Sequence, residues 1–76
     1  MNNTRRKTIA TIMEQLEALR EAVEVLHDEE QEAFDNLPEG IQYSERGEAM
    51  EEAANNLEAA MDSIEEALNY LESAGE

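Results

Sequence analysis

Apolar residues recur at alternating steps of three and four along both halves of this 76-residue chain. The first half carries the series Ile9, Ile12, Leu16, Leu19, Val23 and Leu26. The second half carries the series Met50, Ala53, Leu57, Ala60, Ile64, Ala67 and Leu71. This spacing is that of a heptad and makes each series the a/d seam of an α-helix, the face expected to contact a neighbouring helix. The pattern therefore predicts an all-α chain built from two amphipathic, coiled-coil-like helices.

A single interruption separates the two predicted helices. Residues 36–48 contain the only proline and two of the three glycines. Pro38 ends the first helix, because its ring restricts the preceding residue and it has no N–H to donate. Ser44 is a suitable N-cap for the second helix. We expect one domain over residues 1–76, an antiparallel hairpin with helices at about 4–36 and 45–74 and a turn at 37–44.

The hairpin is small for an isolated fold. The chain has no cysteine, so no disulfide can stabilise it, and a chain this short buries only a modest core. In the second helix Ala54, Met61 and Leu68 lie beside the series and widen its apolar face. We therefore expect a homodimer in which two hairpins form a four-helix bundle, or a hairpin that completes its core on another protein. The residues expected at the interface between copies are Leu57, Ile64, Leu68 and Leu71.

The formal net charge is −15, and all twenty carboxylates follow Met13. Such a surface repels nucleic acid and anionic lipid and attracts basic proteins, so we expect no direct binding to nucleic acid or membrane. The acids recur every seven residues on both helices, and the positions where a solvated helix usually carries Lys or Arg are rarely basic. We predict that these acidic faces bind a basic partner protein. The residues concerned are Glu14, Glu17, Glu21, Glu24, Asp28, Glu51, Glu58, Asp62 and Glu65.

Rows of carboxylates on a rigid helix could occupy a groove that is built for nucleic-acid phosphates. The chain would then be a nucleic-acid mimic that inhibits a nucleic-acid-binding protein, and its binding would weaken with salt. Two other interpretations stay open. The acidic faces could be merely solvated, or the apolar stripe could dock on a larger complex as a structural or assembly module.

Catalytic chemistry is not expected. The chain has one histidine and three serines, and no base lies at a helical spacing that would activate a serine. Glu24 and His27 form a Glu-x-x-His pair of the kind found in carboxylate-bridged di-iron bundles. Glu24 is expected on the outer side of the apolar stripe, however, and His27 on its flank. A metal-binding bundle is therefore the third hypothesis, and we predict no metal and no cofactor.

A basic cluster of Arg5, Arg6 and Lys7 begins the first helix, where cations oppose the helix dipole. In an antiparallel hairpin this cluster would lie beside the carboxyl end of the second helix. The acids expected to pair with it there are Glu65, Glu66, Glu72 and Glu76. The cluster is not followed by the apolar block of a secretory signal, so we expect a cytoplasmic protein.

The segment from Asp28 to Glu48 resembles the turn region of a group of small acidic helical-hairpin proteins. Its sequence is D-E-E-Q-E-A-F-D-N-L-P-E-G-I-Q-Y-S-E-R-G-E. Those proteins are encoded by phages, prophages and bacteria, and most have no assigned role. The matching positions are Phe34, Asn36, Leu37, Pro38, Glu39, Ser44, Glu45, Arg46 and Gly47. The resemblance implies a phage or mobile-element setting, hence the host cell cytoplasm, and a non-catalytic small protein. It supplies no activity.

Tyr43 and Arg46 in this segment are not required for a turn between two helices. Arg46 could satisfy the last carbonyls of the first helix or pair with Asp35 or Glu32. Otherwise Tyr43 and Arg46 belong to the residue types that are enriched in binding hot spots. We therefore include both among the candidate partner-binding residues.

Overall fold

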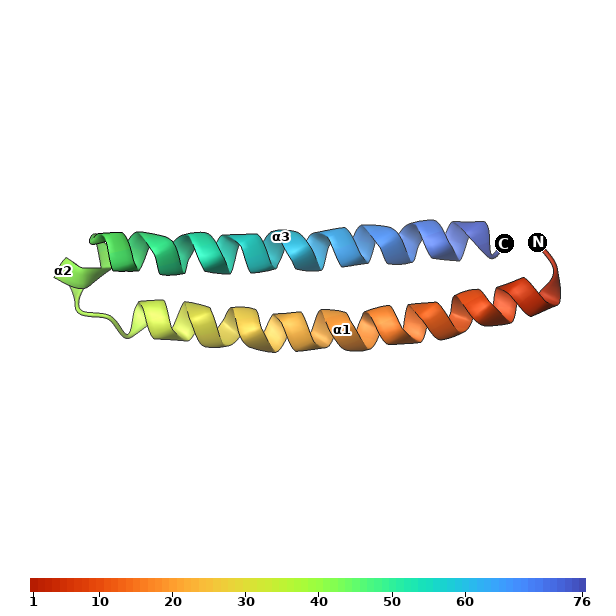
Figure 1. The fold of residues 1–76 in the computed structure, drawn as a ribbon, viewed down its shortest axis with the longest axis horizontal. Coiled ribbons are helices and arrows are strands. Elements are labelled where there is room, and N and C mark those ends of the chain that lie inside the picture. The colour runs from red at the N-terminus through yellow and green to blue at the C-terminus, as the bar shows by residue number, and fades with distance from the viewer.

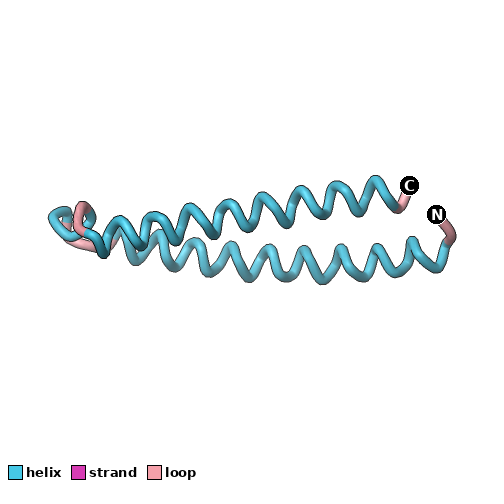
Figure 2. The backbone as a smooth tube through the Cα atoms, turned by 45° about the horizontal axis from the view of Figure 1, so that its top comes forward, coloured by secondary structure: helices cyan, strands magenta, loops and turns pink.

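Two long antiparallel helices lie side by side over almost the whole chain (Figure 1). The computed structural model describes all residues 1–76 and contains α1 (Asn3–Asp35), α2 (Glu39–Gln42) and α3 (Glu45–Ala74), with no strand. The two termini meet at one end and the turn lies at the other (Figures 1 and 2). The predicted all-α class and the packing of two long helices against each other are confirmed.

Side-chain caps set where both long helices begin. Asn2 Oδ1 accepts a hydrogen bond from the Arg5 backbone N–H at 2.8 Å, which satisfies one of the amides that a helix start leaves unpaired. Ser44 Oγ accepts a hydrogen bond from the Gly47 backbone N–H at 3.4 Å, so the predicted N-cap of the second helix is confirmed. The observed bounds of α1 and α3 lie within one residue of those expected.

The turn contains a short helix, α2, that the sequence did not predict. The Pro38 carbonyl accepts hydrogen bonds from the N–H groups of Ile41 and Gln42 at 2.8 and 3.1 Å. Gln42 also turns back toward α1 and donates from Nε2 to the carbonyls of Phe34 and Asp35 at 3.2 and 3.5 Å. The last carbonyls of a helix have no partner within it. Gln42 therefore both caps α1 and fastens the turn to it.

Gly47 allows the turn to lie against the first residues of α3. A Cβ at this position would collide with the main-chain oxygens of Ile41 and Gln42. Gly40, by contrast, lies in α2 and has no neighbour within 4 Å of its Cβ position. No glycine has a positive φ, so close approach and not backbone conformation is what requires a glycine at Gly47.

The face of α1 that contacts α3 differs from the one that the apolar series predicts. Apart from Gln31, the half-buried residues of this segment form an unbroken heptad: Ile9, Met13, Leu16, Arg20, Val23, His27, Glu30, Phe34 and Leu37. Ile12, Leu19 and Leu26 were expected in this contact and are exposed instead. The expected contact is therefore wrong at every second position of α1, where the structure places Met13, Arg20 and His27.

Helix α3 is turned in the same way. Its contact with α1 is made by Met50, Ala54, Leu57, Met61, Ile64, Leu68 and Leu71. Ala54, Met61 and Leu68, which were expected beside the series, thus take the central positions. Ala53 and Ala67 are half-buried beside the contact and Ala60 is exposed, so the alternate positions of the expected series are wrong here too.

The two helices form a layer with almost no interior. The molecule measures 58 × 15 × 12 Å, and Ala54 and Leu68 are its only buried apolar residues. Its accessible surface is 5600 Å², whereas a compact monomer of 8.6 kDa exposes about 4,700 Å². The hairpin therefore exposes about 900 Å² more than a compact chain of its mass.

Candidate protein-interaction surfaces

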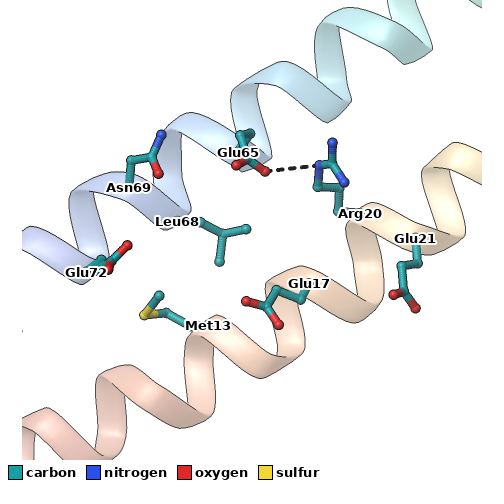
Figure 3. A pocket seen from close by; sticks show the side chains of 8 residues that line it. All are labelled: Met13, Glu17, Arg20, Glu21, Glu65, Leu68, Asn69 and Glu72. Atoms are coloured by element: carbon teal, nitrogen blue, oxygen red, sulfur yellow. Dashed lines mark ion pairs between the residues drawn. The ribbon is translucent and has the colours of Figure 1, made fainter.

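The orientation of α1 and α3 sorts the remaining side chains onto two opposite faces of the layer. Each helix has two flanks, one on either side of its contact row. The first flank contains Glu17 on α1 and Glu65 on α3, and the second flank contains Ile12 on α1 and Ala53 on α3. Glu17 of α1 lines one pocket together with Glu65 and Glu72 of α3 (Figure 3). The first flanks of both helices therefore share one face, and the second flanks share the other.

One face, here called the acidic face, carries rows of carboxylates from both long helices. Next to the contact these rows hold Glu17, Glu24, Glu51, Glu58, Glu65 and Glu72. Farther out they hold Glu14, Glu21, Asp28, Asp35, Glu48 and Asp62. All nine acidic residues predicted to bind a partner lie on this face. The heptad pattern alone did not predict that the acidic rows of both helices share one face, because it did not fix how each helix is rotated about its own axis.

A hollow lies between the helices on the acidic face (Figure 3). Met13 and Leu68 lie between α1 and α3, and the hollow is also lined by Glu17, Arg20, Glu21, Glu65, Asn69 and Glu72. Arg20 Nε lies 3.2 Å from Glu65 Oε2. The two charges pair at this distance, but Nε is buried and has no acceptor in hydrogen-bonding geometry. Both side chains are partly exposed, so we expect the ion pair to contribute only about 0.2–1 kcal/mol.

The basic amino terminus does little to neutralise the acidic face. Arg6 donates from Nε to the main-chain oxygen of Gly75 at 3.0 Å and from Nη2 to that of Glu76 at 3.4 Å. The predicted approach of the basic cluster to the carboxyl end of the second helix is confirmed for Arg6. Its partners there are main-chain oxygens, however, and not the carboxylates expected. Arg5 and Lys7 form no ion pair.

The opposite face, here called the apolar face, consists of Ile12, Leu19 and Leu26 on α1 and of Ala53, Ala60 and Ala67 on α3. The exposed fractions of Ile12, Leu19 and Leu26 are 38%, 57% and 51%. The next rows outward on this face hold Thr8, Gln15, Ala22, Glu29, Ala49, Asn56, Ser63 and Tyr70. Glu29 is the one carboxylate in either set. Sequence reasoning missed this face because it assigned the same apolar residues to the contact within the hairpin.

The four residues predicted for an interface between copies lie in the contact between α1 and α3. Leu68 is buried and borders the hollow on the acidic face. Leu57, Ile64 and Leu71 are half-buried and form the contact row nearer the apolar face. Leu68 is therefore used within the hairpin, whereas the other three are only partly covered by α1.

Tyr43 and Arg46 lie at the turn without stabilising it. Tyr43 is 77% exposed. Arg46 is exposed and forms no ion pair with Asp35 or Glu32. The structural roles considered for Arg46 are therefore wrong: the last carbonyls of α1 accept hydrogen bonds from Gln42 and from the backbone N–H groups of Asn36 and Leu37 instead.

The Glu24 and His27 side chains do not form a metal site within one chain. His27 lies in the contact with α3 and not on the flank expected for it, and its Nδ1 is 3.1 Å from Asp28 Oδ1. Glu24 lies on the acidic face. No three His, Asp or Glu side chains are grouped closely enough to hold a metal ion.

No protein-family model, no curated protein and no solved structure matches this chain. None of its helices is both long and apolar enough to cross a membrane. Its fold and surfaces define a two-faced helical hairpin, in which α1 and α3 form a thin layer with one acidic face and one apolar face.

Proposed function

We propose that this chain is a non-catalytic binding protein whose acidic face binds a basic surface on a partner protein. The observation that carries the proposal is the collection of all nine predicted carboxylates on one face. Like charges on neighbouring turns repel one another, and Arg20 is the only lysine or arginine between Lys7 and Arg46. A face adapted only to water would relieve this repulsion with a few lysines. A basic partner relieves it by charge complementarity.

The partner that we propose is a nucleic-acid-binding protein, which the hairpin would inhibit as a mimic of nucleic acid. The length of 58 Å divided by the net charge of −15 gives about 3.9 Å of length per charge, close to the roughly 3.4 Å per charge along one DNA strand. A groove that accepts phosphates would therefore meet a similar density of negative charge. The resemblance of the turn supports a phage-encoded antagonist of a host defence or nucleic-acid-processing protein, acting in the host cytoplasm.

The turn is a second candidate contact with the same partner. Tyr43 and Arg46 are both exposed at the end of the layer. Neither side chain has a structural task that would explain it, and both belong to the residue types that contribute most to binding energy at interfaces.

We also propose that the chain acts as a homodimer whose two hairpins form a four-helix bundle. The hairpin exposes about 900 Å² more than a compact monomer of its mass. A standard protein interface buries about 800 Å² on each partner. The excess exposed area is therefore similar to one side of a dimer interface.

An assembly module that docks on a larger complex is the second candidate function. The exposure of Ile12, Leu19 and Leu26 favours it. Its binding would resist salt, since apolar burial does not depend on charge screening. The metal-binding bundle is not proposed, because no third ligand lies beside Glu24 and His27.

Two matched triple variants test the acidic face. The combination of Glu17→Gln, Glu24→Gln and Glu58→Gln removes three charges from this face and leaves the ion pair of Arg20 with Glu65 intact. The control combines Glu32→Gln, Glu52→Gln and Glu66→Gln, which remove three charges from the outer edges of the layer. The measurement is capture from host lysate at low and high salt, with identification by mass spectrometry.

We expect the unmodified chain to retain a nucleic-acid-binding protein that salt releases and that added DNA or RNA displaces. The acidic-face variant should lose this partner and the control should keep it. Equal loss in both variants would show that net charge alone matters and would contradict the assigned face. A partner that survives both high salt and the acidic-face substitutions would favour the assembly module.

A further inference from the structure

The apolar stripe of each long helix is turned away from the other helix. On α1 the row of Ile9, Leu16 and Val23 belongs both to the apolar stripe and to the contact with α3. The second row of the stripe begins with Ile12, whereas the second row of the contact begins with Met13. Successive residues lie about 100° apart around a helix, so the middle of the stripe lies about 50° from the middle of the contact. Helix α3 is turned through the same angle toward the same face.

This angle is close to the one that a four-helix bundle requires. Where four helices stand at the corners of a square, the direction to the centre lies about 45° from the direction to each neighbour. Core side chains point to that centre and not along the line to a single neighbour. The hairpin therefore supplies two adjacent corners of a bundle, with the apolar stripes of both directed to one side of the layer.

We infer that a second copy of this chain covers the apolar face and that the two acidic faces form the outer sides of the resulting bundle. This inference rests on the proposed homodimer and assigns its interface. The face is self-complementary, as a two-fold interface requires. The pairing of Arg20 with Glu65 puts Leu26 nearly level with Ala60, and Leu19 nearly level with Ala67. A two-fold rotation about an axis parallel to the helices would set each of these leucines against an alanine of the second copy.

Charge selects the same face for a second copy. The apolar face and its outer rows contain Glu29 as their one carboxylate, and Glu30 borders them near the turn. Contact through the acidic face would bring the carboxylate rows of both copies together, and the repulsion between like charges would oppose it. Contact through the apolar face leaves these rows in water on opposite sides of the bundle.

The bundle carries twice the negative charge of one hairpin over the same length. Two chains of charge −15 on the same length of 58 Å give about 1.9 Å of length per charge, close to the roughly 1.7 Å per charge of duplex DNA. The whole dimer therefore carries about the linear charge density of a duplex, and each of its two acidic sides carries about that of one strand.

The first test compares glutamate substitutions at two adjacent alanines of α3. Ala60 lies on the apolar face, and Ala59 lies on the outer edge of the layer; both are exposed in the hairpin. Sedimentation equilibrium of the unmodified chain should give twice the chain mass of 8.6 kDa. Ala60→Glu should give the mass of one chain, and Ala59→Glu should remain dimeric. A monomeric unmodified chain at high micromolar concentration would overturn the dimer, and a dimeric Ala60→Glu would overturn the assigned face.

A second measurement covers the case in which Ala60→Glu also unfolds the hairpin. The chain has no cysteine, so Ala60→Cys and Ala59→Cys each introduce a single thiol. At high chain concentration a maleimide should label Ala60→Cys many times more slowly than Ala59→Cys, and the two rates should converge on dilution. Equal rates at every concentration would overturn the assigned face. Neither result bears on the acidic face, whose partner binding is measured separately on the folded chain.

Discussion

Arg20 of α1 and Glu65 of α3 form the one ion pair that joins the two long helices, with 3.2 Å between Nε and Oε2. One heptad nearer the turn, the same two positions hold His27 and Glu58. Antiparallel helices with a heptad repeat place equivalent positions in equivalent contacts. His27 therefore lies where a second interhelical ion pair could form.

We predict that His27→Arg stabilises the hairpin. An arginine at this position should pair with Glu58 as Arg20 pairs with Glu65, and a partly exposed ion pair contributes about 0.2–1 kcal/mol. Urea unfolding followed by circular dichroism measures the change in the free energy of unfolding. The same substitution in a Glu58→Gln background should give a smaller gain. An equal gain there would mean that the reduced net charge, and not the pair, is responsible.

Gly47→Ala should destabilise the hairpin by about 1–3 kcal/mol, because its Cβ would displace the turn from the start of α3. Gly40→Ala is the matched control, since its Cβ position is open. We expect the control to keep the free energy of unfolding or to raise it by up to about 1 kcal/mol, since alanine fits this site and has less conformational freedom in the unfolded chain. Thermal unfolding of both variants at one chain concentration makes the comparison. Similar midpoints for the two variants would contradict the role assigned to Gly47.

Loss of the Gln42 amide should weaken the junction between α1 and the turn. Gln42→Ala removes the donor that serves the carbonyls of Phe34 and Asp35, at an expected cost of about 1 kcal/mol. Gln42→Glu should cost more, because a carboxylate cannot donate to these carbonyls and opposes the negative end of the helix dipole. Asn55→Ala, at an exposed site on the acidic face of α3, serves as the control in denaturant unfolding. A loss no larger than that of the control would exclude this capping role.

Added sodium chloride should raise the melting temperature. The net charge of −15 and the grouped carboxylates repel one another within the folded chain, and salt screens this repulsion. The variant that carries Glu17→Gln, Glu24→Gln and Glu58→Gln should respond less steeply than the unmodified chain. A melting temperature that falls with salt would mean that attractive pairs outweigh the repulsion.

The ends of the helices could be predicted from the sequence, because the residues that set them act on their own neighbours in the chain. Pro38 and Ser44 are of this kind. The orientation of each helix could not, because it depends on every helix that surrounds it. The stripe of Ile12, Leu19 and Leu26 suits a single neighbour as well as it suits the centre of a bundle. In the structure Arg20 and His27 face α3, and the stripe of Ile12, Leu19 and Leu26 lies outside that contact.

The residues of the turn were harder to predict for a similar reason. Gln42 and Gly47 matter because the turn folds back on α1 and α3, and this contact depends on the path of the chain in space. The one local signal of this contact was Gly47, which lies near the start of a segment of strong helix formers. Glycine lowers helix stability, so its presence there indicates that a larger side chain would not fit. The acidic rows could be recognised on each helix separately. That both sets of rows lie on the same face of the hairpin follows only once the residues in contact between α1 and α3 are known.

The contacts of the hairpin become steadily more distant in sequence from the turn toward the termini. Gln42 and Phe34 are 8 residues apart, and Arg6 and Gly75 are 69 apart. The entropy lost on closing a loop grows with its length, so we expect the contacts beside the turn to form first. Each contact then shortens the loop that the next must close, and the two helices should pair progressively from the turn toward the termini. Opening should run in reverse, from the end held by Arg6 toward the end held by Gln42, so the two ends of the layer should differ in kinetic stability although the helices are similar in composition.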